Sequence, residues 1–563
     1  MEKYLIIIVV ILGFLIWKSK YDAKSRKEKL RYQLTKQWGT VPKQEYTSEK
    51  FYSLGAYYRL KKNDKTDVDD ITWNDIDMDE IFMLMNNTCS AMGEEYLYFI
   101  LHQLKYDEQD LLEREHLINF FSHNEEARLK FQEILSNMGK VREISVYEYM
   151  NRLKTVPKED NMVHYLMIIS ILAAISVIFF VPPLGLLLTI FAALNNIVRY
   201  YKRKSEIEAY FTVVSYIIRM LDCVKEIEAC NYPELSNYRE KLSKAKKSYA
   251  GFRKGARVVA SKKPTGDLLD VGLDYLRMIF HFDLIKFNSM ICTFENSNED
   301  MNLMFETIGL LDSMIAVASF RVLMGEWCIP KFTDKSKKFL SVKEIYHPLL
   351  ENPVKNSITQ NQCVLITGSN ASGKSTFIKT VAINAILAQT IHTVMADDYF
   401  ASYFYVASSM ALTDNLSNNE SYYIVEIKSL KRILDRLNNE YPILCFVDEV
   451  LRGTNTLERI AASSQILYSF AASNALCFAA THDIELTHIL EEFYSNYHFQ
   501  EQVVEQEILF DYRLYEGRAV SKNAIKLLGI MGYSKEIISK AEALASHFLE
   551  CGEWEKCERS EVN

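Results

Sequence analysis

Residues 363–376 read CVLITGSNASGKST, an apolar run followed directly by a loop rich in glycine and serine. The run Cys363–Thr367 predicts a buried strand, and Gly368–Thr376 matches the phosphate-loop pattern G-x-x-x-x-G-K-[ST] plus one residue. In such a loop the glycines let backbone N–H groups turn toward an anion, and the following helix adds its positive N-terminus. We therefore predict a strand–loop–helix unit that binds a nucleoside triphosphate.

The residues of this loop have separate predicted roles. The Lys374 ammonium can reach the β- and γ-phosphates, and the Ser375 hydroxyl can ligate Mg²⁺. The predicted cofactors are therefore ATP and Mg²⁺. The predicted nucleotide-binding residues are Gly368, Ser369, Asn370, Ala371, Ser372, Gly373, Lys374, Ser375 and Thr376.

A second apolar strand carries the other half of the predicted site. Residues 441–449 read YPILCFVDE, so Asp448 and Glu449 stand at the end of a buried strand. Asp448 is expected to hold Mg²⁺ directly or through water, and Glu449 to orient and deprotonate the attacking water. His482 follows another apolar run, residues 475–480, and is expected to sense the γ-phosphate. The predicted catalytic residues are Lys374, Glu449 and His482, and the predicted metal ligands are Ser375 and Asp448.

Composition limits the classes of partner. The chain has 563 residues, enough for several domains, and its formal net charge of −8 gives no global nucleic-acid footprint. Any contact with DNA would need a local basic patch, such as Lys241–Lys263, which has nine Lys or Arg residues and no acid. That stretch fits phosphate contacts and a solvated helical face equally well. The ten cysteines match no zinc or redox spacing, which indicates reduced cytosolic thiols.

One long segment without charge predicts contact with a membrane. Residues 165–198 carry no Asp, Glu, Lys or Arg and are interrupted by Pro182-Pro183. A single helix of this length would measure ~50 Å, against ~30 Å for the hydrocarbon core of a bilayer. Two arms, Tyr165–Val181 and Leu184–Val198, fit better, although each is short for a full crossing. We expect a tight or re-entrant membrane hairpin, and a buried hairpin in a soluble core is the alternative.

A second apolar segment, Leu5–Trp17, is followed by a cluster of Lys and Arg with no small-residue cleavage site, which predicts an uncleaved anchor. Basic residues also flank the hairpin on both sides. The positive-inside rule therefore places these flanks and the nucleotide-binding domain in the cytoplasm of a multi-pass protein of the cell membrane. The flanking residues are Lys154, Lys158, Arg199, Lys202, Arg203 and Lys204.

Three segments together resemble a known family. Residues 366–376 (ITGSNASGKST), 446–456 (FVDEVLRGTNT) and 480–483 (ATHD) are similar to the ATPase core of MutS-type mismatch-repair proteins, which belongs to the ABC-like ATPases. The resemblance implies a homodimer in which ATP is sandwiched between two chains. Residues 421–426 (SYYIVE) resemble the family segment whose serine reaches the ATP of the other subunit, so Ser421 is implied as a contact in trans.

The sequence also departs from the family. The residues before 71 are too few for the family's mismatch-reading and connector domains. The string Phe131-Gln132-Glu133 matches the family's Phe-x-Glu wedge, but it lies inside a helical run of the lever region, and we interpret it as a chance match. Ala371-Ser372 replaces the usual Met-Gly of the loop, Leu451 stands where glycine is usual, and 457–459 (LER) replaces the common x-Asp-Gly. These changes are compatible with ATP turnover, but they argue against a mismatch reader.

We therefore expect a multidomain chain with an all-α lever and core domain, membrane helices and a C-terminal α/β ABC-like P-loop ATPase domain. The expected divisions are 1–20 (N-terminal membrane anchor), 21–70 (linker), 71–160 (first part of the helical core), 163–198 (transmembrane hairpin), 201–335 (second part of the helical core), 336–545 (MutS-type ATPase domain) and 546–563 (tail).

The expected function is that of a membrane-anchored ATP hydrolase, a homodimeric conformational switch that binds DNA and has no small-molecule substrate beyond ATP. The alternative is an ABC-like membrane ATPase that acts on a lipid or a membrane protein instead of DNA.

Overall fold

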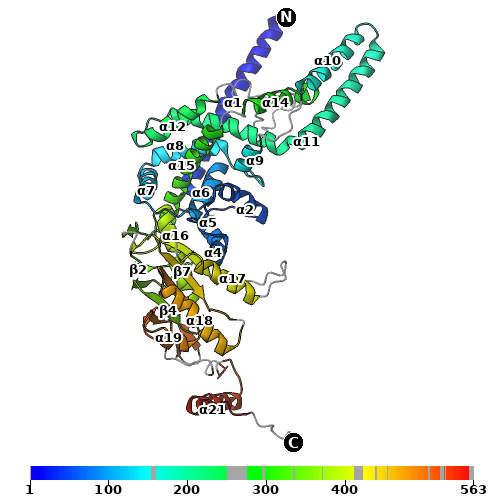
Figure 1. Ribbon diagram of the computed structural model, residues 1–563. Helices are drawn as coiled ribbons and strands as arrows, with labels where there is room; N and C mark the ends of the chain where they lie inside the picture. The colour runs from blue at the N-terminus through cyan, green and yellow to red at the C-terminus, as the bar shows by residue number, and fades with distance from the viewer. Residues whose placement is uncertain are drawn as a thin grey trace. The chain divides into compact units, whose positions relative to one another are not determined.

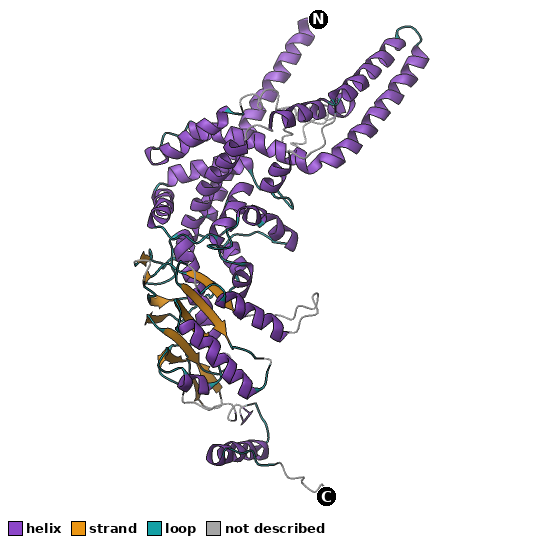
Figure 2. Cartoon of the chain, viewed as in Figure 1, coloured by secondary structure: helices purple, strands orange, loops and turns teal. Residues whose placement is uncertain are grey.

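The computed structural model divides the chain into two compact units. Unit 1 comprises residues 1–63, 82–103 and 109–325, and unit 2 comprises residues 64–81, 104–108 and 326–563. Strands, among the described residues, occur only in unit 2 (Figure 2). The structure describes residues 2–153, 160–249, 275–294, 298–333, 337–369, 372–410, 422–437, 440–452, 454–504, 507–519, 525, 528–529 and 531–556.

Unit 1 is helical, as expected for the lever and core domain, and within it α6 and α15 pack against each other. Gly93 and Gly309 let these two helices approach closely, because a Cβ at Gly93 would lie 2.2 Å from Asp312 and one at Gly309 would lie 2.6 Å from Tyr96. The helices that lie wholly or almost wholly in unit 1 are α1 (Glu2–Gln37), α2 (Ser48–Leu54), α3 (Ala56–Lys61), α6 (Ala91–His102), α7 (Glu108–His123), α8 (Glu125–Met138), α9 (Val146–Arg152), α10 (Asn161–Ile178), α11 (Pro182–Glu228), α12 (Ser236–Lys247), α14 (Phe282–Phe294) and α15 (Asn298–Met324), with the 3₁₀ turn η2 (Pro233–Leu235). Helix α5 (Met78–Met85) includes the division between the units after residue 81.

Buried charge joins the central pair of helices. The Asp312 carboxylate on α15 accepts hydrogen bonds from the backbone N–H groups of Cys89 (2.9 Å) and Ser90 (2.8 Å), just before α6 begins. The Ser90 hydroxyl donates to the same carboxylate (2.5 Å). Burial raises the pKa of Asp312 to about 6, although these donors act in the opposite direction. The carboxylate therefore satisfies donors at the α6 N-terminus that would otherwise be buried without partners.

The apolar segment around Pro182-Pro183 forms two adjacent antiparallel helices, α10 and the first part of α11 (Figure 1). The expected division between hairpin and core implies that the second helix ends near Val198, but it does not. It continues to Glu228 as one helix of 47 residues, because no proline or glycine interrupts residues 199–228. The hairpin and the helical core are thus continuous through α11.

Three described helices are long and apolar enough to cross a bilayer by length and composition alone: α10, α11 and α15. The apolar window of α15 is 78% buried, so this helix belongs to the core of unit 1. The windows of α10 and α11 are each only 17% buried. The backbone of Glu2–Gln37 is a single helix, whereas most side chains of the expected anchor lie outside the described part of the chain.

Unit 2 is an α/β domain built on mixed sheets, which confirms the α/β part of the expected C-terminal fold class. Its main sheet has six strands in the order β12-β9-β4-β8-β7-β6, and all neighbours are parallel except β12 and β9. A second sheet has the order β1-β5-β2-β3, and β10 and β11 form an antiparallel pair. The strands are β1 (Lys331–Phe332), β2 (Leu340–Ile345), β3 (Asn356–Gln360), β4 (Cys363–Thr367), β5 (Asp398–Ala401), β6 (Tyr405–Ser409), β7 (Ile443–Asp448), β8 (Ala475–Ala480), β9 (Tyr494–His498), β10 (Glu501–Val504), β11 (Glu507–Phe510) and β12 (Tyr515–Glu516).

Helices cover both faces of the main sheet. One buried cluster joins inward-facing residues of β4, β7 and β8 to residues of α17, α18 and α19. Helix α16 contacts β6, β7 and β8 but is not part of that cluster, so it lies on the opposite face. The helices of unit 2 are α4 (Asp70–Asp75), α16 (Lys374–Ile391), α17 (Tyr422–Leu434), α18 (Thr456–Ala471), α19 (Ile484–Ile489) and α21 (Lys535–Cys551).

Two short pieces of the N-terminal half belong to unit 2, which the division at residue 336 did not anticipate. Helix α4 packs on β6: the Asp75 carboxylate accepts hydrogen bonds from the Ser408 hydroxyl (2.7 Å) and the Met410 N–H (3.0 Å). In residues 104–108, the Tyr106 ring stacks on Tyr441 with centroids 4.0 Å apart. These contacts are specific pairs of residues far apart in sequence, so periodicity alone could not reveal them.

Candidate functional site

The predicted phosphate loop lies between β4 and α16, as the sequence pattern requires. Gly368 and Gly373 both have positive φ, 150° and 106°. A Cβ at Gly368 would lie 2.8 Å from the backbone oxygen of Phe499 and 2.9 Å from Ser372 Oγ, so this position has no room for a side chain. Asn370 and Ala371, two of the predicted nucleotide-binding residues, lie outside the described part of the chain.

Lys374, the first residue of α16, turns its side chain back over the loop. Its Nζ donates to the backbone oxygens of Gly368 and Ser369, both at 2.8 Å. Burial lowers the pKa of Lys374 below its ordinary value, although the charges of the nearby Asp448 and Glu449 act in the opposite direction. The ammonium is therefore held among backbone oxygens and carboxylates beside the loop, where a phosphate would be its natural partner.

Sheet order brings the two halves of the predicted site together. In the parallel order β4-β8-β7, Ala480 pairs with Ile366 on one side and with Asp448 on the other. The carboxyl ends of the three strands therefore lie at one edge, where ligands bind in open α/β sheets. At this edge the Ser375 hydroxyl donates a hydrogen bond of 2.6 Å to Asp448 Oδ2.

Ser375 and Asp448 fit a magnesium ion. The second carboxylate oxygen, Asp448 Oδ1, is buried and has no hydrogen-bond partner among the described residues. Hydroxyl and carboxylate oxygens are the hard ligands that Mg²⁺ prefers, and Mg²⁺ usually binds one or two carboxylates with phosphates and water completing its shell. Among the residues that the structure describes, no group of three or more His, Cys, Asp or Glu could hold a metal.

Glu449 is fixed by two cationic or polar neighbours. Its Oε1 lies 3.0 Å from His482 Nε2, and its Oε2 forms an ion pair with Arg452 Nε. His482 Nε2 is also 3.5 Å from Lys374 Nζ. Burial and the Lys374 charge lower the pKa of His482, which Glu449 opposes. A neutral His482 at neutral pH can therefore exchange hydrogen bonds with Glu449 or with a phosphate oxygen.

The turn after Asp448 has a strained backbone at the position where the family usually has glycine and this chain has Leu451. Glu449 and Leu451 have φ of 54° and 59°, in the left-handed region that favours glycine. Leu451 tolerates this conformation because its side chain is buried in the hydrophobic cluster of the main sheet and its N–H donates to the Glu426 carboxylate. Burial raises the pKa of Glu426. The buried side chain thus compensates for the backbone strain.

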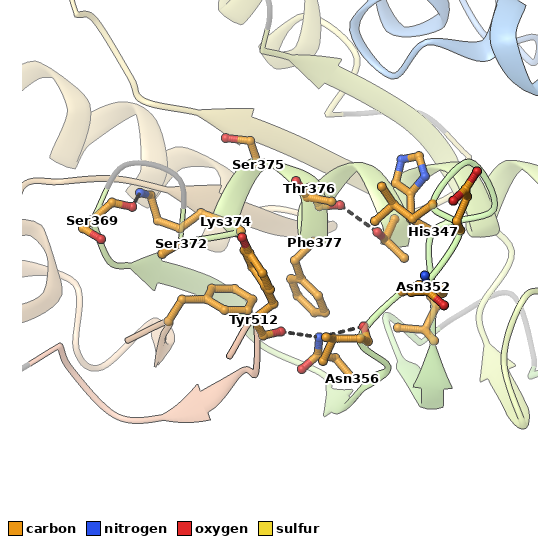
Figure 3. A pocket seen from close by; sticks show the side chains of 18 of the residues that line it. His347, Asn352, Asn356, Ser369, Ser372, Lys374, Ser375, Thr376, Phe377 and Tyr512 are labelled. Atoms are coloured by element: carbon orange, nitrogen blue, oxygen red, sulfur yellow. Dashed lines mark hydrogen bonds between the residues drawn. The ribbon is translucent and has the colours of Figure 1, made fainter. Parts of the chain in front are cut away.

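A cavity of about 600 Å³ opens beside these residues, within the range of pockets that hold small ligands. Ser369, Lys374 and Ser375 lie at one end, and His347 and Asn352 lie at the other (Figure 3). Its lining also includes Glu449 and Arg452, so the polar end of the cavity coincides with the predicted phosphate site.

Several lining residues carry no motif in the sequence. Tyr512 lines the cavity, and a Cβ at Gly373 would lie 3.2 Å from its ring. Asn356 positions this segment, because its Nδ2 donates to the Tyr512 oxygen (3.1 Å) and its Oδ1 accepts from the Leu514 N–H (2.8 Å). Glu501 accepts a hydrogen bond from the Ser369 hydroxyl (2.7 Å). No local pattern could have shown that Phe499, Glu501 and Tyr512 lie beside Gly368, Ser369 and Gly373.

The structure brings together most, but not all, of the predicted site. Lys374, Ser375, Asp448, Glu449 and His482 converge at one sheet edge, joined by the contacts given above. Ser421 lies outside the described residues, so its predicted contact in trans stays a prediction.

Comparison with known proteins places this domain. Residues 364–549 match the family model described as MutS domain V. "MutS protein homolog 4" of Mus musculus is 32% identical over 268 residues, which make up 44% of this chain and 27% of that relative. "DNA mismatch repair protein MutS" of Thermus aquaticus is 28% identical over 239 residues, 42% of this chain and 29% of that relative. The chain thus spans less than a third of the length of these relatives.

The match over residues 364–549 and the relatives named MutS support membership of the chain in the MutS family. MutS domain V is an ATPase-type domain, and the matched residues include the strands and loops that carry Lys374, Asp448 and His482. The names of the MutS relatives do not favour the alternative of an ATPase acting on a lipid or a membrane protein.

The strict space limit at Gly368 gives a direct test of the loop. We expect Gly368→Ala to weaken ATP binding at least about tenfold, because the added Cβ would displace the backbone at Phe499. The matched control is Gly517→Ala, which has a positive φ of 92° but no atom within 4 Å of the added Cβ. Titration with a fluorescent ATP analogue would measure both. If the two variants lost the same amount of ATP affinity, the loss would come from backbone strain at a substituted glycine, and not from the lack of space in the phosphate loop.

Proposed function

We propose that this MutS-family chain is an ATP hydrolase that acts as a dimeric, ATP-driven switch on DNA while attached to a membrane. The observation that carries the ATPase part is the convergence of Lys374, Ser375, Asp448, Glu449 and His482 beside one cavity. Each of these groups has the chemistry that phosphoryl transfer to water requires.

The proposed roles follow from the positions of the side chains. The Lys374 ammonium and the loop N–H groups hold the phosphates, and Mg²⁺ bound through Ser375 and Asp448 would neutralise phosphate charge. Glu449 orients the attacking water and takes its proton, while His482 and Arg452 keep the carboxylate in place. His482, held near both Lys374 and Glu449, reports whether a γ-phosphate is present.

We propose that two chains close over ATP. Ser421 of one chain would contact the ATP bound by the other, and it immediately precedes α17. Helix α17 is tied to α4 by an ion pair between Arg432 and Asp69, and Arg432 also donates to the Ser408 oxygen. A displacement of α17 on dimer closure would therefore move α4 with it.

The DNA part of the proposal rests on the relatives, one of which is named as a DNA mismatch repair protein. A local basic surface supports it. Helix α12 buries Tyr238, Leu242 and Ala245, and on its other side it exposes Lys241, Lys244 and Lys247. Lysines in this arrangement suit phosphates and not base edges, which agrees with the lack of a predicted mismatch wedge.

Attachment to a membrane is proposed from the hairpin. The apolar windows of α10 and α11 are mostly exposed, and basic residues follow on α11 from Arg199. A large exposed apolar surface bordered by positive charge is typical of segments that contact lipid. By the same logic the ATPase domain lies in the cytoplasm.

The ATPase proposal predicts the effect of one substitution. Glu449→Gln keeps the shape of the side chain but removes the base, so we expect the rate of ATP hydrolysis to fall by about 10²–10⁴-fold. ATP affinity should change by less than about twofold. The control is Glu492→Gln, an exposed acid outside the cavity lining. Normal hydrolysis by the Glu449→Gln protein would remove Glu449 from the role of base.

The DNA proposal predicts that the protein binds duplex DNA in a salt-dependent manner and that the lysines of α12 contribute to this binding. Replacing Lys241, Lys244 and Lys247 together with alanine should weaken duplex binding and reduce the slope of log K against log salt by up to about three. Replacing the exposed Lys431, Lys535 and Lys540 of unit 2 is the matched control. Fluorescence anisotropy with perfect, mismatched and branched duplexes would measure both. If the full-length protein shows no salt-sensitive affinity for any DNA, the DNA part is wrong.

A further inference from the structure

The turn that joins α10 to α11 is apolar throughout. Phe179 and Phe180 are each 84% exposed, and Val181 beside them is also exposed. From residue 177 to residue 188 no side chain carries an oxygen or nitrogen atom. A turn that projects into water normally carries polar residues, and one that emerges beyond a membrane normally carries an interfacial belt of Trp or Tyr.

The backbone of this turn leaves few groups for water. The N–H groups of Phe179, Phe180 and Val181 donate to backbone oxygens of the preceding helix at 3.2, 3.0 and 2.8 Å. The next two residues are prolines and have no N–H. Gly185 allows the tight apex, because a Cβ there would lie 2.3 Å from the backbone nitrogen of Ile178. Such internal satisfaction is what a non-helical segment needs inside hydrocarbon.

The hydroxyl groups of the two arms are satisfied in the same way. Ser170, Ser176 and Thr189 donate to backbone oxygens within their own helices at 2.8, 2.7 and 2.8 Å. Between the tip and the exposed Tyr165 and Asn195, which lie next to the base, the exposed side chains of both helices are apolar apart from these internally bonded hydroxyls.

A polar network marks the base of the hairpin. Asn196 Nδ2 donates to the Ile279 oxygen (3.0 Å), and His281 lies 3.0 Å from both the Asn196 oxygen and His164 Nδ1. One further turn along α11, Tyr200 donates to Asp283 Oδ2 (2.7 Å). These buried contacts tie both arms to the segment that begins α14.

The distance from this base to the tip is too short for a crossing. From His164 to Phe179 there are fifteen residue steps, or about 23 Å of helix, and from Pro182 to Asn196 there are fourteen, or about 21 Å. The hydrocarbon core of a bilayer is ~30 Å thick. The polar base would have to enter the hydrocarbon before the tip could leave it on the far side.

We propose that the α10–α11 hairpin is a re-entrant wedge, which enters the bilayer from the cytoplasmic face and keeps its Phe179–Val181 tip among the lipid acyl chains. This inference rests on the proposed attachment to a membrane and specifies its form. The ligand of the tip is the hydrocarbon of a phospholipid bilayer. The polar network and Arg199 set the depth of insertion, because burying them in hydrocarbon is costly.

The depth of the tip can be measured with brominated phospholipids, which quench tryptophan fluorescence at the depth of the bromine. The full-length protein would carry Phe180→Trp at the tip or Tyr201→Trp, a matched aromatic replacement of another exposed residue, beyond the base. Both variants would be reconstituted in sealed vesicles of phosphatidylcholine and phosphatidylglycerol, and the wild-type signal subtracted. ATP hydrolysis at the wild-type rate and flotation with vesicles would serve as controls of folding and attachment.

A wedge predicts that bromines near the acyl-chain ends quench the tip tryptophan at least about threefold more than bromines near the headgroup, and that iodide on either side of the membrane has no effect. The tryptophan at residue 201 should show the opposite order. Quenching of the tip by iodide trapped inside the vesicles would mean a full crossing, and a tip unquenched in protein that floats would mean attachment through another segment. Either result overturns the wedge alone, whereas failure to float overturns the proposed attachment to a membrane as well.

Discussion

The hydrogen bond from Ser375 to Asp448 is the contact on which the proposed site depends. It joins the first turn of α16 to the end of β7, and it forms only because β8 lies between β4 and β7 in a parallel sheet. That order places the ends of all three strands at one edge, where Lys374, Glu449 and His482 also meet. The cavity, the strained turn at Glu449–Leu451 and the buried Asp448 oxygen lie at the same edge.

Much of the site could be predicted because its residues lie in short, local patterns. The apolar runs at 363–367 and 475–480 form strands with those same bounds. Tyr512, Asn356 and Glu501 could not be predicted, because each reaches the loop through the tertiary fold. The same limit applies to Asp75, whose partners Ser408 and Met410 lie more than three hundred residues away in sequence.

Unit 1 uses polar groups differently from unit 2. Asp312, Asn196 and Tyr200 are buried and paired at helix crossings, so they fix which helices meet. Between the pairs formed by Asn196 and Tyr200 and the hairpin tip at Phe179–Val181, α10 and α11 carry few polar side chains, and the hydroxyls there bond to their own helices. The boundary between paired polar residues and bare apolar surface separates the helical core from the part that we assign to lipid.

The central claim, that Ser375 and Asp448 form the magnesium site of an ATPase, is tested most directly by the dependence of ATP affinity on Mg²⁺. ATP binding to the full-length protein would be measured with Mg²⁺ and with a chelator, for the wild type and for Asp448→Asn. The account predicts that Mg²⁺ strengthens ATP binding on the order of tenfold in the wild type and has little effect in the variant. The same enhancement by Mg²⁺ in both proteins would contradict it.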